Sequence, residues 1–417
     1  MPPSRPVTAA EQDQGAVTRL GGAGRPARQR SLRDHNLGLA LRLVADAPEP
    51  VSRARIASLT GLTRATASAL VEALLDGGLV REVVLPPTSR SGRPAVGLAL
   101  APGGPGGLGL EVNVDYVATT VVDLTGAVVH HEIRQGDQRE LAPAEALRLA
   151  ARAGATALAA AGRKGVRVAG AAVALPGLVR DGRLLLAPNL GWQDVDVRAL
   201  LARNRALGAL PLSFDNEANY AALSEVSATT RSFVHVSGEI GIGAGIVLDG
   251  ELYRGSHGWG GEIGHVTVDP SGPRCHCGSD GCLEVYAGQE AIVRAAGLSS
   301  GGGTLLGGQG AALAERAAQG HPGLLAALDG AASALGTALA GVLNLLDVTT
   351  VVLGGVYAPL SPWLLATVRR ELDRRVLWSA WEAPRVRAAG HGPQAAVHGA
   401  ARSVVTGVLS EPERWLP

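Results

Sequence analysis

The chain has 417 residues, of which 46% are hydrophobic, so it can bury large cores and is expected to form two or three domains. Its net charge is only +1, yet residues 1–105 contain 13 Arg against 8 acidic residues, which makes the N-terminal part basic and the remainder acidic. The N-terminus lacks a signal-peptide pattern, and no stretch of about 18 residues is uniformly apolar, so we expect a cytoplasmic protein without a membrane partner.

The basic N-terminal part begins with an arm. Residues 1–30 are rich in Pro, Gly, Ala and Arg and have no hydrophobic periodicity, which predicts disorder. From Ser31 the pattern becomes helical, and the predicted first helix ends before Pro48.

Residues 31–101 are typical of a DNA-binding module. Ser52 is expected to cap a short second helix, and Gly61 breaks it. Thr63 caps a third helix, in which apolar residues recur at spacings of three and four. Two helices joined by such a tight turn predict a helix-turn-helix.

Two predicted strands, 80–85 and 95–100, follow the third helix and flank a Pro- and Arg-rich loop at 86–94. This arrangement is typical of the wing of a winged helix. Polar side chains at the start of the third helix and in the wing could reach the bases or phosphates of double-stranded DNA. The candidate DNA contacts are Thr63, Arg64, Thr66, Ser68, Arg90 and Arg93. The alternative is a helix pair in a small interaction domain with a solvated basic loop.

Residues 102–107 are rich in Gly and Pro and predict a linker to the next domain, residues 108–410. In that domain strand-like and helical stretches alternate, which predicts a mixed α/β architecture with two successive lobes. The expected strands are 108–114, 117–124, 166–175, 233–236, 244–253 and 348–353, and the expected helices include 142–161 and 324–345.

The three cysteines of the chain lie close together, at Cys275, Cys277 and Cys282, and His265 precedes them. Three thiolates and one imidazole form the ligand set of a closed tetrahedral zinc site. We therefore predict structural Zn²⁺ within residues 265–282. The alternatives are three buried free thiols, or His276 in place of His265 as the fourth ligand.

Polar residues gather around this cluster and at a second point of the sequence. Glu262, His265 and Glu284 are close to the metal ligands, and Asn216 and Glu217 stand at a strand end and a helix start. Carboxylates, amides and an imidazole can exchange hydrogen bonds with a polyhydroxylated ligand such as a sugar. The alternatives are orientation of the zinc ligands and helix capping by Asn216.

Taken together, the motifs resemble those of the ROK family (repressor, open reading frame, kinase) over roughly residues 31–410. The most specific stretches are 261–265, 275–278 and 281–284, supported by 175–177, 187–192, 216–219 and 241–247. The resemblance implies an actin-like (ribonuclease H-like), two-lobed ATPase-type fold with a sugar cleft between the lobes. It implies sugar contacts at Asn189, Asn216, Glu217, Glu262, His265 and Glu284, and zinc ligands at His265, Cys275, Cys277 and Cys282.

The chain departs from the family's kinases where ATP would bind. Those kinases carry an Asp-x-Gly-Gly-Thr phosphate loop, whereas residues 111–115 here are Glu-Val-Asn-Val-Asp, whose side chains would block close approach of a polyphosphate. A second kinase loop has Glu239 here, whose negative charge would repel ATP, and the kinases' general-base Asp corresponds to Glu217. These differences predict ligand binding without phosphoryl transfer, and hence no enzyme.

The resulting expectation is a sugar-responsive, DNA-binding transcriptional regulator that acts as a homodimer or homotetramer and represses carbohydrate-utilisation genes. One alternative is an ATP-dependent sugar kinase with an added DNA-binding module. Another is a scaffold whose winged helix binds protein.

Overall fold

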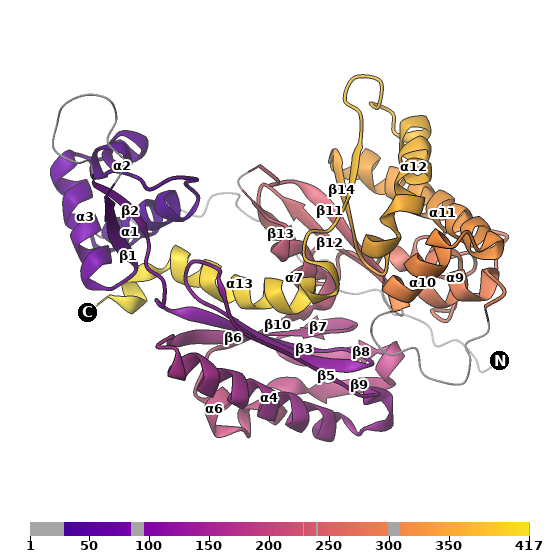
Figure 1. Cartoon of the computed structure of the whole chain (residues 1–417), viewed down its shortest axis with the longest axis horizontal. Coiled ribbons are helices and arrows are strands. Elements are labelled where there is room, and N and C mark those ends of the chain that lie inside the picture. The colour runs from indigo at the N-terminus through magenta and orange to yellow at the C-terminus, as the bar shows by residue number, and fades with distance from the viewer. Residues whose placement is uncertain (1–28, 85–95, 228, 239–240, 299–308, 417) are drawn as a thin grey trace, which may run out of the picture.

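The structure is a computed structural model and describes residues 29–84, 96–227, 229–238, 241–298 and 309–416 (Figure 1). The predicted arm lies outside the described residues except for Gln29 and Arg30, with which helix α1 begins. The predicted wing loop, with Arg90 and Arg93, also lies outside them.

The N-terminal module, residues 29–84 and 96–100, has three helices and a two-stranded antiparallel sheet: α1 (Gln29–Ala45), α2 (Arg53–Thr60), α3 (Arg64–Asp76), β1 (Val80–Val84) and β2 (Val96–Leu100). The Ser52 hydroxyl caps α2 by accepting a hydrogen bond from the Arg55 N–H (3.2 Å). Gly61, with φ of 72°, makes the tight turn, and Thr63 caps α3 by accepting from the Thr66 N–H (3.1 Å). The predicted helix-turn-helix is confirmed.

Lobe 1 is built on a five-stranded mixed sheet in the order β10-β6-β3-β4-β5. Its strands are β3 (Gly106–Val112), β4 (Tyr116–Val122), β5 (Val128–Gln135), β6 (Val168–Leu175) and β10 (Leu212–Asn216). Strand β3 begins within the stretch expected as a linker. Helix α4 (Pro143–Arg163) covers one face of the sheet, and α13 (Ala395–Ser410) covers the other (Figure 1). The remaining elements are η1 (Gln138–Glu140), β7 (Leu178–Arg180), β8 (Arg183–Ala187), η2 (Pro188–Leu190), β9 (Trp192–Asp196), α5 (Val197–Ala202), α6 (Arg205–Gly208) and α7 (Glu217–Ser224).

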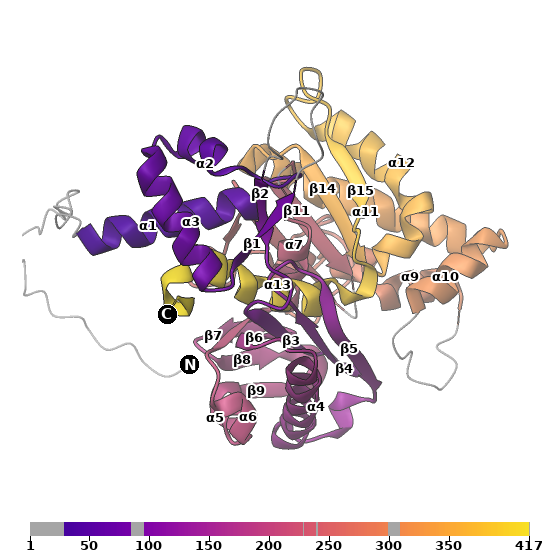
Figure 2. The same cartoon turned by 60° about the vertical axis from the view of Figure 1, so that its left-hand side comes forward.

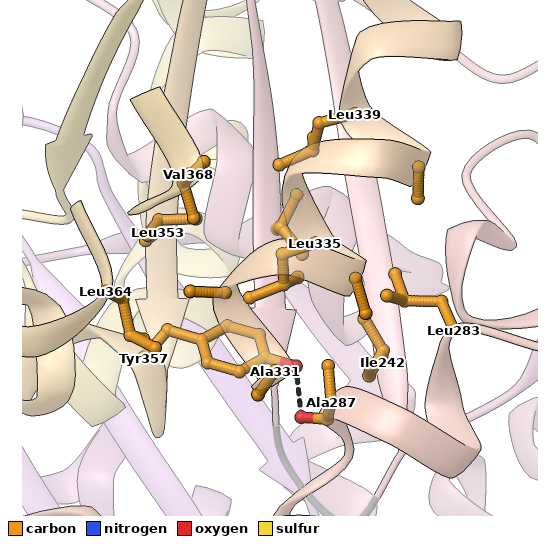
Figure 3. Close-up of a cluster of buried hydrophobic side chains, with 14 of the residues drawn as sticks. Ile242, Leu283, Ala287, Ala331, Leu335, Leu339, Leu353, Tyr357, Leu364 and Val368 are labelled. Carbon is orange, nitrogen blue, oxygen red and sulfur yellow. Dashed lines mark hydrogen bonds between the residues drawn. The ribbon is translucent and has the colours of Figure 1, made fainter. Parts of the chain in front are cut away.

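Lobe 2 contains a second five-stranded sheet in the order β13-β12-β11-β14-β15. Its strands are β11 (Phe233–Gly238), β12 (Ile242–Leu248), β13 (Glu251–Tyr253), β14 (Thr350–Gly355) and β15 (Arg385–Ala388). Its helices are η3 (Ile263–His265), α8 (Glu284–Ala287), α9 (Gln289–Ala295), α10 (Gln309–Ala318), α11 (Pro322–Leu346) and α12 (Tyr357–Arg375), and η4 (Gly392–Gln394) leads into α13. Leu335 and Leu353 belong to the core that buries Tyr357, whose hydroxyl donates to the Ala287 carbonyl (2.8 Å; Figure 3). The predicted mixed α/β class with two lobes is confirmed.

Among the described helices, α11 alone is long and apolar enough by length and composition to span a membrane. However, Leu328, Leu335 and Leu339 of this helix are fully buried in the core of lobe 2. A core helix of a soluble protein passes the same test, so this property is weak evidence for a membrane span.

Helix α13 packs very closely on its neighbours because glycines stand at the contacts. A Cβ on Gly109 of β3 would overlap the carbonyl oxygen of Val397, and a Cβ on Gly399 would overlap the carbonyl oxygen of Tyr220 in α7. At these points backbone meets backbone, so α13 has little freedom to move separately from β3 and α7.

The N-terminal module shares its hydrophobic core with distant parts of the chain. Lobe 1 and α13 supply buried residues to it: Val122, Leu124, Ala401, Val405 and Val408. Beyond α13, η5 (Pro412–Trp415) and Leu416 also pack against this core. Figure 2 shows α13 running from the lobes to the N-terminal module. The first and last described segments of the chain therefore pack together.

Candidate functional site

The predicted zinc ligands come together at the edge of lobe 2. One ligand atom from each of His265, Cys275, Cys277 and Cys282 lies within 4.8 Å of the others. The Cys275 Sγ is 3.8 Å from the His265 Nδ1, and the Cys277 and Cys282 sulfurs are 3.7 Å apart. His276 is not a member of this cluster. Three sulfurs and an imidazole nitrogen at such separations fit a tetrahedral zinc ion.

Two glycines let the chain between the cysteines fold back on itself. Gly278 and Gly281 have φ of 94° and 63°, and a Cβ on Gly281 would overlap the Asp269 carbonyl oxygen. The Leu283 N–H then donates to the Val266 carbonyl (2.9 Å). This loop therefore fixes the start of α8, where Glu284 stands.

The three predicted sugar contacts of lobe 2 are neighbours of this loop. Glu284 Oε2 accepts a hydrogen bond from the Ile242 N–H (3.2 Å), which orients the carboxylate. Burial raises the pKa of Glu262, the nearby His265 lowers it, and Glu284 raises it further. Glu262, His265 and Glu284 therefore influence one another electrostatically.

The predicted contacts of lobe 1 come from η2, the end of β10 and the start of α7. Asn216 caps α7, because its Oδ1 accepts from the Ala218 N–H (2.8 Å), and its Nδ2 donates to the Gly177 carbonyl (2.9 Å). Burial, followed by the charge of Glu111, raises the pKa of Glu217 to about 8. The capping interpretation of Asn216 thus holds, and it leaves one amide hydrogen for a ligand.

The two sets of residues meet between the lobes. A Cβ on Gly241 would lie 2.8 Å from Glu284 Oε2 of lobe 2 and 3.3 Å from Asn189 Nδ2 of lobe 1. The charge of Glu262 also contributes to the raised pKa of Glu217 across the same space. The structure therefore brings the predicted sugar contacts of both lobes into one region.

A small cavity adjoins this region at Glu217. Lobe 1 lines it with Glu111 and Asn113, lobe 2 with Ser237 and Gly355, and the first turn of α13 with Ala396. Glu111 is 2% exposed, and burial raises its pKa to about 7. The sequence marks Glu111 and Asn113 only as departures from a phosphate loop, although one acidic residue in the otherwise apolar β3 is a signal for a specific role.

The candidate DNA contacts within the described residues lie at the start of α3. Thr63, Arg64 and Thr66 are exposed, and Ser68 is half-buried. The Thr63 hydroxyl caps α3 and lies 2.9 Å from the Thr66 hydroxyl, so both already have partners within the module. Arg64, at the first position of α3, is an exposed cation.

Comparison with known proteins agrees with this architecture. The chain matches the ROK family over residues 107–406 and the IclR helix-turn-helix domain over residues 39–83. It is 27% identical to the xylose repressor of Bacillus spizizenii, with 78% of this chain and 84% of that protein covered.

Solved structures of two kinds resemble it. A ROK family transcriptional regulator, a homolog of the Escherichia coli MLC protein, superposes with a TM-score of 0.74 at 26% identity, covering 91% of this chain and 97% of the other. A ROK family glucokinase from Streptomyces griseus in complex with glucose and AMPPNP superposes with a TM-score of 0.59 at 26% identity, covering 71% of this chain and 98% of the other. Since the family match spans well over half of the sequence, this chain belongs to the ROK family.

Proposed function

We propose that the chain is a sugar-responsive, DNA-binding transcriptional repressor of carbohydrate-utilisation genes. The observation that carries the proposal is a helix-turn-helix module packed into one core with a ROK domain. The resemblance to the xylose repressor of Bacillus spizizenii supports the same function.

The residues at the kinase positions support a binding protein in place of an enzyme. Asn113 puts a side-chain amide into the cavity at a position where the family's kinases have a glycine beside phosphate. A side chain at this position blocks the close backbone approach that a polyphosphate needs, and the described residues that line the cavity include no cation.

Within this proposal, the sugar binds between the lobes, and DNA contacts Arg64 and its neighbours. The sugar contacts are Asn189, Asn216, Glu217, Glu262, His265 and Glu284. The DNA contacts are Thr63, Arg64, Thr66, Ser68, Arg90 and Arg93. Glu262 and Glu284 are held beside the zinc ligands, so the metal stabilises the loop that presents them.

The protein acts in the cytoplasm as a homodimer or homotetramer on a two-fold symmetric operator. Half-sites on DNA repeat every 34–36 Å, that is about one helical turn, so a small rotation of two modules relative to each other breaks the match. A sugar that binds one lobe arrangement better shifts the population toward it.

The test combines DNA selection with calorimetry. The protein should bind a DNA duplex selected from a random library, and D-xylose, D-glucose or another pentose or hexose should raise the Kd of this complex. Calorimetry should show the same sugar binding directly to the protein. Arg64→Ala should abolish specific DNA binding while the circular dichroism spectrum is retained. Retention of specific DNA binding by the folded Arg64→Ala protein would contradict the assigned DNA interface.

The second candidate, a sugar kinase, is favoured by the likeness to the glucokinase structure. A coupled assay of ATP turnover over the same sugars decides between the two. Phosphorylation that Glu217→Ala abolishes would contradict a pure regulator.

A further inference from the structure

Glu111 is a buried carboxylate with partners from two segments of the chain. Its Oε1 accepts hydrogen bonds from the Tyr116 hydroxyl (2.6 Å) and from the Asn113 Nδ2 (3.3 Å). Tyr116 packs against Val397 in the first turn of α13, and the Val397 N–H lowers the pKa of Glu111, whose Oε2 has no hydrogen-bond partner among the described residues. A buried charge is stable only with such partners, and the N-terminus of a helix is favourable for an anion. Glu111 therefore joins β3 electrostatically to the start of α13.

Asn113 connects Glu111 to Glu217. The Asn113 Oδ1 accepts from the Val114 N–H (2.6 Å), which fixes the amide plane. Its Nδ2 then lies 3.1 Å from the Tyr116 hydroxyl oxygen, 3.3 Å from Glu111 Oε1 and 3.4 Å from Glu217 Oε2. Two amide hydrogens thus face three acceptors, so any change in the bond to Glu217 alters what the amide offers to Glu111.

The charges of the two carboxyl groups are also linked. The charge of Glu111 helps to raise the pKa of Glu217 to about 8, so Glu217 is mainly protonated at neutral pH. A sugar hydroxyl that donates to Glu217 favours its ionised form. A buried and a half-buried carboxylate this close repel each other, so ionisation of Glu217 changes the interaction of Glu111 with α13.

A change at the first turn of α13 reaches the N-terminal module along a closely packed helix. The helix has 16 residues and is therefore about 24 Å long. Its Gly399 lies against the α7 backbone, and its Val405 and Val408 belong to the core of the N-terminal module.

We propose that Asn113 and Glu111 are positioning residues that connect the sugar contact Glu217 to the N-terminus of α13, and through α13 connect sugar binding to the DNA-binding module. The proposal rests on the proposed function and names the path of its regulation. Binding of a sugar hydroxyl to Glu217 draws this carboxyl away from Asn113, the fixed amide then donates more fully to Glu111, and α13 shifts against the module.

The experiment measures coupling in the full chain, with D-xylose and D-glucose as probes. The Kd of the selected duplex is determined by fluorescence anisotropy with and without saturating sugar. In the unmodified protein the two values should differ by about 5- to 150-fold, the usual range for coupling between two sites. In Asn113→Ala the ratio should fall below about 2, while sugar-free DNA affinity and sugar affinity stay within about threefold.

Asn219→Ala is the matched control. Asn219 is 2% exposed, like the 4% of Asn113, but its amide donates to Asp215 and not to Glu111. This variant should keep the ratio of the unmodified protein. Tyr116→Phe removes the hydroxyl that donates to Glu111 and accepts from Asn113, and it should reduce the ratio in part, which keeps the test available if Asn113→Ala does not fold.

Two further measurements separate coupling from stability. Because coupling is reciprocal, DNA must change sugar affinity by the same factor in each variant. Sugar should change hydrogen–deuterium exchange of residues 395–400 in the unmodified protein but not in Asn113→Ala. A folded Asn113→Ala protein with the unmodified ratio would overturn this path alone. An unmodified protein whose DNA binding no sugar changes would overturn the proposed function itself.

Discussion

The carboxyl groups in the interlobe cavity are held in a charge state that depends on their surroundings. Burial raises the pKa of Glu111 to about 7 and that of Glu217 to about 8, and each group raises the cost of ionising the other. In the unfolded chain both would ionise near the ordinary glutamate pKa of 4.5. Between pH 4.5 and about 8, the folded protein therefore binds more protons than the unfolded chain.

This difference predicts how stability depends on pH. For a group with a raised folded-state pKa, the contribution to stability is complete below the unfolded pKa of about 4.5 and is lost as pH rises through about 8. As pH rises from 5 to 8, the free energy of unfolding of Glu217→Gln should thus fall less than that of the unmodified protein. At pH 8 it should be more stable by on the order of 1–3 kcal/mol, a figure reduced for partial exposure. Urea unfolding at several pH values measures this. Glu251→Gln, at an exposed carboxylate of β13, should leave the pH profile unchanged.

The metal ligands lead to a second prediction at the scale of residues. Cys277→Ser should lower the zinc content from about one ion per chain toward zero, because a closed four-ligand site loses affinity and loop order together. Sugar affinity should fall with it, since Glu262 and Glu284 depend on the same loop. His276→Ala, outside the cluster, should retain zinc. Elemental analysis and calorimetry measure both properties, and a zinc-free variant with full sugar affinity would contradict the structural role of the metal.

At this scale, separation along the chain decides what the sequence reveals. His265 and the cysteines are close in sequence, and their chemistry is specific, so their clustering is predictable. Glu217 and Asn113 are 104 residues apart, and their contact depends on how α7 docks beside β3. No spacing rule applies to such a pair.

At the scale of elements, α13 shows what local sequence does not reveal. Residues 395–410 have no side-chain cap and include glycines at Gly399 and Gly407, which disfavour a helix, so an isolated sequence gives little indication of α13. Its stability comes from packing on β3 and α7. By contrast, α2 and α3 have caps at Ser52 and Thr63 and are predictable.

The two glycines of α13 provide a test within one helix. Gly399→Ala places a Cβ into the Tyr220 carbonyl oxygen, whereas a Cβ on Gly407 meets nothing within 4 Å. Gly399→Ala should therefore destabilise the protein by about 2–3 kcal/mol or more, and Gly407→Ala should be neutral or stabilising by about 0.5–1 kcal/mol. Chemical unfolding of both variants measures the difference. Equal stability of the two variants would contradict the close packing of α13 on α7.

At the scale of the whole molecule, the shared core joins the N-terminal module to the rest of the chain. The Arg167 guanidinium lies 4.7 Å from the centre of the Trp415 ring, and Trp415 and Leu416 pack against the core of the module. We therefore expect the module and lobe 1 to unfold together. Neither the pairing of the two chain ends nor the contribution of Val122 to this core can be read from local patterns.

Trp415→Ala tests this arrangement. The substitution should cost about 1–3 kcal/mol and separate an early unfolding transition of the N-terminal module from that of the lobes. Differential scanning calorimetry detects this separation. Trp381→Ala is the matched control, because Trp381 is 83% exposed, and its unfolding profile should match that of the unmodified protein. Identical profiles for the two variants would contradict the role of Trp415 in joining the module to the lobes.

The joining of the two chain ends also has a consequence for synthesis on the ribosome. Domains generally fold in order of emergence, N-terminal first. Here the N-terminal module needs Val405, Val408 and the residues around Trp415 to complete its core, and these are translated after both lobes. DNA binding therefore matures only after nearly the whole sensing domain has been made. A prematurely terminated chain would carry the helix-turn-helix sequence but lack a complete module. Such a chain could not respond to sugar, and it could not occupy operators either.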